Sequence, residues 1–127
     1  MGYCVDLQDN NFRFKKEDSE NIFKALKEFA NNVKKLMWAD EYSILHAEDI
    51  EECFEELRYP LIENGEFYEI DYFSGEKLGD EDKIFNSIAK YIEKDTYLEF
   101  VGEDGDVFRL VFDGEKCEYK YPKIVWE

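Results

Sequence analysis

Two glutamates and one arginine form the converging charged group that the sequence predicts: Glu99, Arg109 and Glu118. Paired carboxylates are the raw material of general acid and base catalysis, in which one group donates a proton and the other accepts one. An arginine between them would keep both carboxylates ionised, because it stabilises the charged form of each. Opposite charges across an exposed sheet contribute about 1 kcal/mol or less. The pattern therefore favours a structural ion triad, and we assign no catalytic residue.

The cysteines and the histidine have spacings that fit no common metal or nucleophile motif. Cys4, Cys53 and Cys117 are far apart, no CxxC pair is present, and His46 is the single histidine. Zinc sites built on several histidines are therefore excluded, and the acidic loop 102–106 lacks the ligand spacing of an EF-hand. We predict no metal and no cofactor. The cysteines are expected to be small core residues in the reducing cytoplasm.

Negative charge is concentrated in one part of the chain. The net charge over 127 residues is −16, and residues 36–76 contain 13 acidic residues and one basic residue, Arg58. Such a surface disfavours nucleic acid and membranes and favours a basic protein surface as partner. The alternative is a solvated face of an acidic cytoplasmic protein. The predicted partner-binding residues are Asp40, Glu41, Glu48, Asp49, Glu51, Glu52, Glu55 and Glu56.

Three helices are predicted from apolar residues at helical spacing. The first spans about 19–37 and has the most regular apolar stripe. The second spans about 47–58 and is closed by Pro60, and its glutamates at i, i+3 and i+4 spacing must lie side by side and repel. The third begins after Asp80, which is expected to be its N-cap, and has Ile84, Phe85, Ile88 and Ile92 facing inward.

Alternation of apolar and polar residues predicts the strands. They are expected at 3–7, 12–16, 66–73, 96–101, 107–112 and 115–121. The first two would form an opening hairpin across a polar turn of Asp and Asn residues. The last three would form a meander, because Asp113-Gly114 is the strongest short hairpin signal.

The register of this meander follows from its loop lengths. The five-residue first loop places Glu99 opposite Arg109, and a two-residue second turn pairs Phe112 with Glu115 and Arg109 with Glu118. The apolar face, which the helices must cover, would consist of Leu98, Phe100, Phe108, Leu110, Cys117 and Tyr119.

These elements predict one α+β domain over residues 1–127. Its architecture would be an antiparallel β-sheet, including the C-terminal three-stranded meander, with about three helices packed on one face. The chain shows no secretory signal pattern and no apolar run of the roughly 18 residues that a spanning helix needs. A cytoplasmic location is therefore expected.

Several segments carry a resemblance to a known group of proteins. They are the start Met1-Gly2-Tyr3-x-Val5, residues 75–81, the GEDG-x-x-F-R pattern from Gly102 to Arg109, and the Ile124-Val125-Trp126 end. These segments resemble small proteins from bacterial and phage genomes, which commonly have Trp where Phe108 stands. The resemblance implies a small stand-alone protein, often associated with mobile elements. That group has no established activity, so no catalytic residue is carried over.

Two classes of function compete. The first is a non-enzymatic acidic interaction protein that occludes a basic surface of a partner protein, as a phage or mobile-element inhibitor of host defence or an immunity-type protein would. The alternative is a small-ligand or nucleotide-signal binding protein that uses Arg58 or Arg109 with aromatic side chains. An enzyme is the third hypothesis. The sequence does not predict the oligomeric state.

Overall fold

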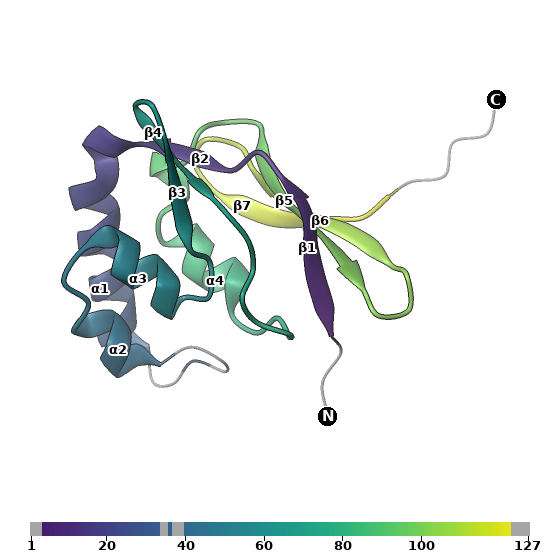
Figure 1. Cartoon of the computed structure of the whole chain (residues 1–127), viewed down its shortest axis with the longest axis horizontal. Helices are drawn as coiled ribbons and strands as arrows, with labels where there is room; N and C mark the ends of the chain where they lie inside the picture. Colours follow the sequence, from purple (N-terminus) through teal and green to yellow (C-terminus); the bar gives the residue numbers. More distant parts are fainter. Residues whose placement is uncertain (1–3, 34–35, 37–39, 123–127) are drawn as a thin grey trace.

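Seven strands form two antiparallel sheets in the part of the chain that the computed structural model describes, residues 4–33, 36 and 40–122 (Figure 1). The larger sheet has the order β1 (Val5–Asn10), β5 (Thr96–Gly102), β6 (Val107–Phe112), β7 (Cys117–Lys120). The smaller sheet has the order β2 (Arg13–Lys15), β4 (Phe67–Ile70), β3 (Leu61–Asn64). The α+β class and the meander β5–β6–β7 are confirmed, but the strands are divided between two sheets.

The predicted opening hairpin is wrong, because β1 and β2 belong to different sheets. β1 pairs with β5 and β2 pairs with β4. The polar link between them is held by bonds to other strands: the Asn10 amide donates to the Ile70 carbonyl at 3.4 Å, and the Asn11 side chain accepts from the Tyr97 N–H at 2.7 Å. Phe12, which follows, is fully buried. The link therefore carries the chain from one sheet to the other instead of turning it back.

The described chain contains four α-helices and two 3-10 turns. They are η1 (Lys16–Asp18), α1 (Ser19–Asn32), α2 (Glu41–Leu45), α3 (Ile50–Glu56), α4 (Glu81–Asn86) and η2 (Ala89–Tyr91). In Figure 1, α1, α2 and α3 are grouped beside the smaller sheet, and α4 contacts β7 of the larger one. Phe12 and Phe14 lie between these layers and contact Phe54 of α3, and Phe12 also contacts Phe85 of α4.

The helices differ from the prediction mainly at their ends. The first is shorter than 19–37, since Val33 is already extended at φ −87° and ψ 142°, after two asparagines of low helix propensity. Residues 34–35 and 37 of that prediction lie outside the described residues. The second begins at Ile50 rather than 47, because Asp49 caps it. The separate short helix α2 was not predicted.

Two further segments depart from the prediction for local reasons. α4 ends at Asn86, where the Ser87 hydroxyl donates to the Ile84 carbonyl and competes with the helical bond; 3-10 turn η2 follows. Asp80 occupies the N-cap position, but its side chain makes no capping bond. Strand β3 was missed, and the strand predicted at 66–73 is the shorter β4. Gly65, at φ 61°, forms the tight turn between β3 and β4.

The register of the meander is correct in its first half and shifted in its second. Glu99 lies opposite Arg109, as predicted. Phe112 pairs with Cys117 rather than Glu115, so Lys120 lies opposite Arg109. The cause is a longer loop, in which the Asp113 side chain accepts from two backbone N–H groups and its own N–H donates to the Lys116 carbonyl at 3.0 Å. A shift of two residues leaves every side chain on its predicted face.

Candidate functional site

The eight predicted partner-binding residues lie on and around α2 and α3, and we call them the acidic flank. Six of them are exposed, and Glu41 and Glu56 are partly buried. None of the eight forms an ion pair with a described residue. The opposite sides of both helices are fixed in the core by Ile44, Ile50 and Phe54. The structure therefore places the eight residues on or just before two helices that contact each other, with most of their side chains exposed.

Part of the acidic flank has a local structural role. Asp40 is the N-cap of α2 and accepts a hydrogen bond of 3.1 Å from the Tyr42 N–H. Asp49 is the N-cap of α3 and accepts one of 2.8 Å from the Glu52 N–H. The Glu52 carboxylate in turn accepts from the Glu48 N–H at 3.0 Å. These bonds satisfy donors that a helix start leaves open, so capping accounts for three of the carboxylates.

The other carboxylates of the acidic flank accept one hydrogen bond or none from the described residues. Glu41 accepts a bond from the Leu36 N–H, and Glu51 accepts one of 2.8 Å from the Tyr68 hydroxyl. Burial and then this bond raise the pKa of Tyr68 to about 12, so it remains a neutral donor. The carboxylates that accept no hydrogen bond from a described residue are Glu48, Glu55 and Glu56.

An aromatic pair borders the acidic flank. The rings of Tyr42 and His46 are stacked with their centroids 3.9 Å apart, and Nδ1 of His46 lies 2.8 Å from the Tyr42 carbonyl oxygen. Tyr42 is 67% exposed. His46 therefore has a structural contact at the end of α2, and the exposed ring adds apolar area beside the carboxylates.

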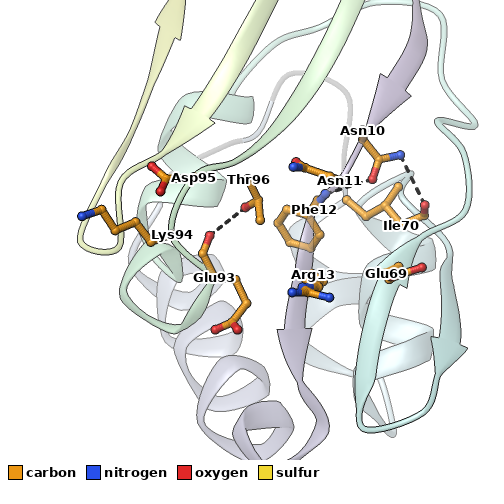
Figure 2. A pocket seen from close by; sticks show the side chains of 10 residues that line it. All are labelled: Asn10, Asn11, Phe12, Arg13, Glu69, Ile70, Glu93, Lys94, Asp95 and Thr96. Atoms are coloured by element: carbon orange, nitrogen blue, oxygen red, sulfur yellow. Dashed lines mark hydrogen bonds between the residues drawn. The ribbon is translucent and has the colours of Figure 1, made fainter.

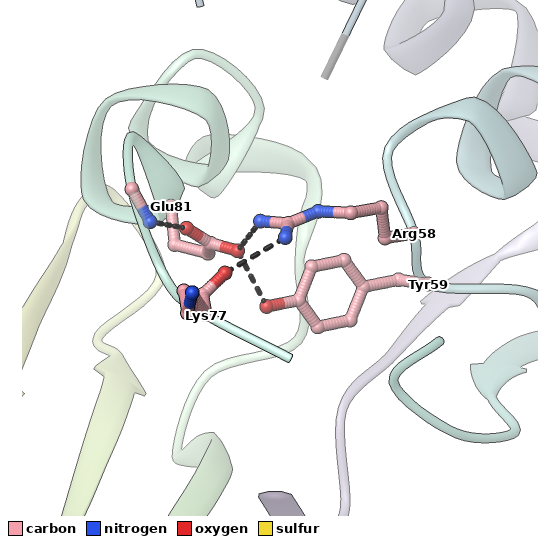
Figure 3. Close-up of polar contacts among 5 residues, drawn as sticks. Arg58, Tyr59, Lys77 and Glu81 are labelled. Atoms are coloured by element: carbon pink, nitrogen blue, oxygen red, sulfur yellow. Dashed lines mark hydrogen bonds and ion pairs between the residues drawn. The ribbon is translucent and has the colours of Figure 1, made fainter. Parts of the chain in front are cut away.

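Arg58 lies in a buried polar network rather than on the surface (Figure 3). Its guanidinium forms an ion pair of 2.7 Å with Glu81 and donates to the Lys77 carbonyl at 2.7 Å. The hydroxyl of Tyr59 donates to the same Glu81 oxygen at 3.0 Å, and the second oxygen accepts from the Gly79 N–H. Burial raises the pKa of Tyr59 well above its usual range, and Glu81 adds to that shift.

The backbone at Arg58 is in the left-handed region, with φ of 80°. It follows the last turn of α3, where the Arg58 N–H bonds to the Glu55 carbonyl and the Tyr59 N–H bonds to the Phe54 carbonyl. This is the Schellman arrangement, which normally has glycine at that position. A long side chain there costs about 1 kcal/mol. The ion pair with Glu81 explains why an arginine stands at this position. A ligand that binds the Arg58 guanidinium would have to displace the Glu81 carboxylate.

Sequence reasoning missed Glu81. It is 1% exposed and lies one turn before Ile84 and Phe85 on the inner face of α4. A carboxylate at i, i+3 and i+4 spacing with buried apolar residues indicates a buried partner, because an isolated buried charge is strongly unfavourable. That signal was available, although it does not identify Arg58 as the partner.

Arg109 is on the uncovered face of the larger sheet. It forms an ion pair of 2.8 Å with Glu99, and its guanidinium lies 4.0 Å from the centre of the Tyr97 ring. The bond to Glu99 raises the pKa of Arg109 above its already high usual value. Glu118 does not join them, because it lies opposite Val111 and pairs with Lys120 at 2.9 Å. The predicted triad is therefore wrong in its third member.

An open hollow of about 620 Å³ lies where the chain crosses between the two sheets (Figure 2). One wall comes from the link between β1 and β2, a second from β4, and the third from the segment before β5. Arg13 and Glu93 connect two of these walls, since the Glu93 N–H donates to the Arg13 carbonyl at 3.1 Å. The sequence did not predict this site, because its residues are far apart along the chain.

The cysteines behave as structural residues. Cys53 and Cys117 are buried, and burial raises the pKa of each thiol to about 12, so both are neutral. Cys4 is partly exposed, and all three are free of disulfides. In the described residues, no group of three or more His, Cys, Asp or Glu side chains is placed to hold a metal ion.

Comparison with known proteins adds no family to these observations. No protein-family model, curated protein or solved structure matches the chain. No described helix is long and apolar enough to cross a membrane. Function has to be inferred from the chain's own residues.

Proposed function

We propose that the chain is a non-enzymatic interaction protein whose acidic flank binds a basic surface of a partner protein. The observation that carries this proposal is the exposed array of carboxylates on α2 and α3, which has no ion pair with any described cation. The one basic residue of that part of the chain, Arg58, is turned away into its ion pair with Glu81. No described Lys or Arg therefore neutralises the negative charge of the acidic flank by an ion pair.

Capping explains only part of the array. Glu48, Glu51 and Glu55 are exposed and cap no helix start with their carboxylates. Glu51 and Glu55 are four residues apart on α3, where like charges repel. Their repulsion is relieved when cations from a partner come between them. Because the helices are packed on the core, the carboxylates are held in position before binding, which reduces the entropy lost in the complex.

The partner expected from this surface is rich in Lys and Arg. Such surfaces occur on proteins that bind nucleic acids, and an acidic protein that covers one competes with the phosphate backbone. A role as a phage or mobile-element inhibitor, or as an immunity-type protein, suits this chemistry. Electrostatic steering would make association fast at low salt and slower as the salt concentration rises.

The test compares two variants with the same change in charge. Glu48, Glu51 and Glu55 are replaced by Lys in one variant, and the exposed residues Glu20, Asp106 and Glu115, outside the acidic flank, are replaced by Lys in the other. Proteins captured from a cell extract on the wild-type chain are identified by mass spectrometry. The affinity of each purified candidate is then measured for all three chains at low and high salt.

We expect at least one captured protein with a basic surface, whose affinity falls about 100-fold for the flank variant and changes by less than about threefold for the control. Equal losses in both variants would show that net charge alone matters. An affinity that survives both the flank substitutions and high salt would contradict the proposal.

A further inference from the structure

Arg13 differs from the other described arginines in having no ion pair. Arg58 and Arg109 each bind a carboxylate at 2.7–2.8 Å, whereas the Arg13 guanidinium lies 4.4 Å from the centre of the Phe67 ring and pairs with no described acid. This is unexpected, since Glu69 lies directly opposite Arg13 across β2 and β4. The Glu69 carboxylate instead accepts a bond of 3.2 Å from the Asn64 amide. Arg13 thus keeps its donors open beside the hollow.

Three of the other four charged residues that line the hollow also have no side-chain partner among the described residues. Figure 2 shows the Arg13 side chain between Glu93 and Glu69 in this view. In the described structure, the side chains of Glu93, Lys94 and Asp95 form neither ion pairs nor hydrogen bonds. Two cations and three carboxylates therefore line one concave surface.

The walls that present these charges are firmly held. The Thr96 hydroxyl donates to the Glu93 carbonyl at 2.8 Å, and the Asn10 amide bonds to the Ile70 carbonyl. Phe12 and Ile70 are buried behind the surface. The hollow is consequently an open surface depression whose floor rests on buried residues, and its volume is within the usual range for small-molecule sites.

From this arrangement we infer that the hollow binds a small zwitterion, a free amino acid or a dipeptide. The ligand's carboxylate would accept two parallel hydrogen bonds from the Arg13 guanidinium, whose planar fork matches that group. Its ammonium group would pair with Glu93. A nucleotide is disfavoured, because its phosphates would lie among Glu69, Glu93 and Asp95.

The inference does not depend on the proposed partner of the acidic flank. The hollow contains none of the flank residues, so the flank variant should keep ligand binding. Loss of partner binding and loss of ligand binding can therefore be told apart in the same set of proteins.

The test is thermal unfolding of the full chain with a panel of probes. The zwitterions are glycine, leucine, lysine, glutamate and glycylglycine; acetate, methylammonium and AMP serve as single-charge and phosphate controls. A ligand at about ten times its Kd should raise the Tm by several degrees. We expect a saturable rise with at least one zwitterion and none with the controls.

Variants then locate the site. Arg13→Gln and Glu93→Gln should each weaken the effective zwitterion about tenfold, whereas Lys15→Gln, an exposed cation on the same strand and face, should leave its Kd unchanged. Amide chemical shifts of Asn11 and Thr96 in the wild-type chain give a second readout that needs no variant. No saturable response to any zwitterion, an equal response to AMP, or full binding by both variants would overturn the inference.

Discussion

Two ion pairs of the same chemistry lie in different surroundings in this molecule. Arg58 and Glu81 have side chains that are 17% and 1% exposed, while Arg109 and Glu99 are 47% and 17% exposed. Both pairs have nitrogen–oxygen distances of 2.7–2.8 Å. Only the first is joined to a buried hydroxyl and a backbone carbonyl. Distance alone therefore does not tell which pair supports the fold; burial and the surrounding bonds do.

The largest expected effect comes from removing one charge of the buried pair. Glu81→Gln leaves the Arg58 guanidinium without its counter-ion in a site that water reaches poorly, so we expect a loss of about 3 kcal/mol in the free energy of unfolding. The matched change Glu99→Gln should cost less than about 1 kcal/mol, because water can solvate the more exposed Arg109 guanidinium in place of the carboxylate. Urea denaturation of both variants checks the comparison. Equal losses would mean that burial is not what separates the two pairs.

A smaller effect is expected from crowding the buried pair without changing its charge. A methyl group at Gly75 would lie 2.6 Å from Arg58 Nη1 and 2.8 Å from Cζ of Phe73. Both groups are held, since Nη1 donates to the Lys77 carbonyl and the Phe73 ring is stacked on the Tyr59 ring. Gly75→Ala should therefore cost about 2 kcal/mol.

A second glycine provides the control for that substitution. Gly65 has φ of 61° but no atom within 4 Å of an added methyl group, so Gly65→Ala should cost only the backbone strain, about 1 kcal/mol. Chemical denaturation gives both values. If Gly75→Ala loses no more unfolding free energy than Gly65→Ala, the Arg58 and Phe73 side chains can move to accommodate the methyl group at little cost.

The smallest effect depends on pH and concerns Tyr59. Its pKa is raised in the folded state, so the folded chain keeps a proton that the unfolded chain loses above its ordinary pKa of about 10. Stability from this group is complete below pH 10 and falls as the pH rises further, by up to about 1.4 kcal/mol per pH unit. Tyr59→Phe removes this group, so the unfolding free energy should fall less steeply with pH, by up to about 1.4 kcal/mol per pH unit. An unchanged slope between pH 10 and 11 would assign the loss to other groups.

The local parts of the fold could be predicted from the sequence. The alternation in residues 96–112 predicts β5, β6 and their register, because a five-residue loop leaves one pairing that buries Leu98 and Leu110 together. The second register failed where the Asp113 side chain closes a longer loop with two backbone bonds. A dipeptide signal cannot show which side-chain bonds will compete with it.

The candidate sites were predictable only where they are local. The exposure of Glu51, Glu52 and Glu55 on α3 agrees with their helical spacing, whereas Asp40, Glu48 and Asp49 lie just before the helices. Glu81 is 23 residues from Arg58, and Glu93 is 80 residues from Arg13, so a periodic pattern predicts neither the ion pair of the first two nor the proximity of the second two. Both depend on how segments far apart in the sequence pack against one another.

The pairing of β1 with β5 sets an order for folding. The first strand of the chain joins a strand about 90 residues later, and it lies at the edge of the larger sheet, next to the meander. Contacts so distant along the chain form slowly, because a long loop must be closed first. During synthesis β1 leaves the ribosome before β5 and cannot form its ladder until β5 has followed. β1 is thus made well before the strand on which its place in the sheet depends.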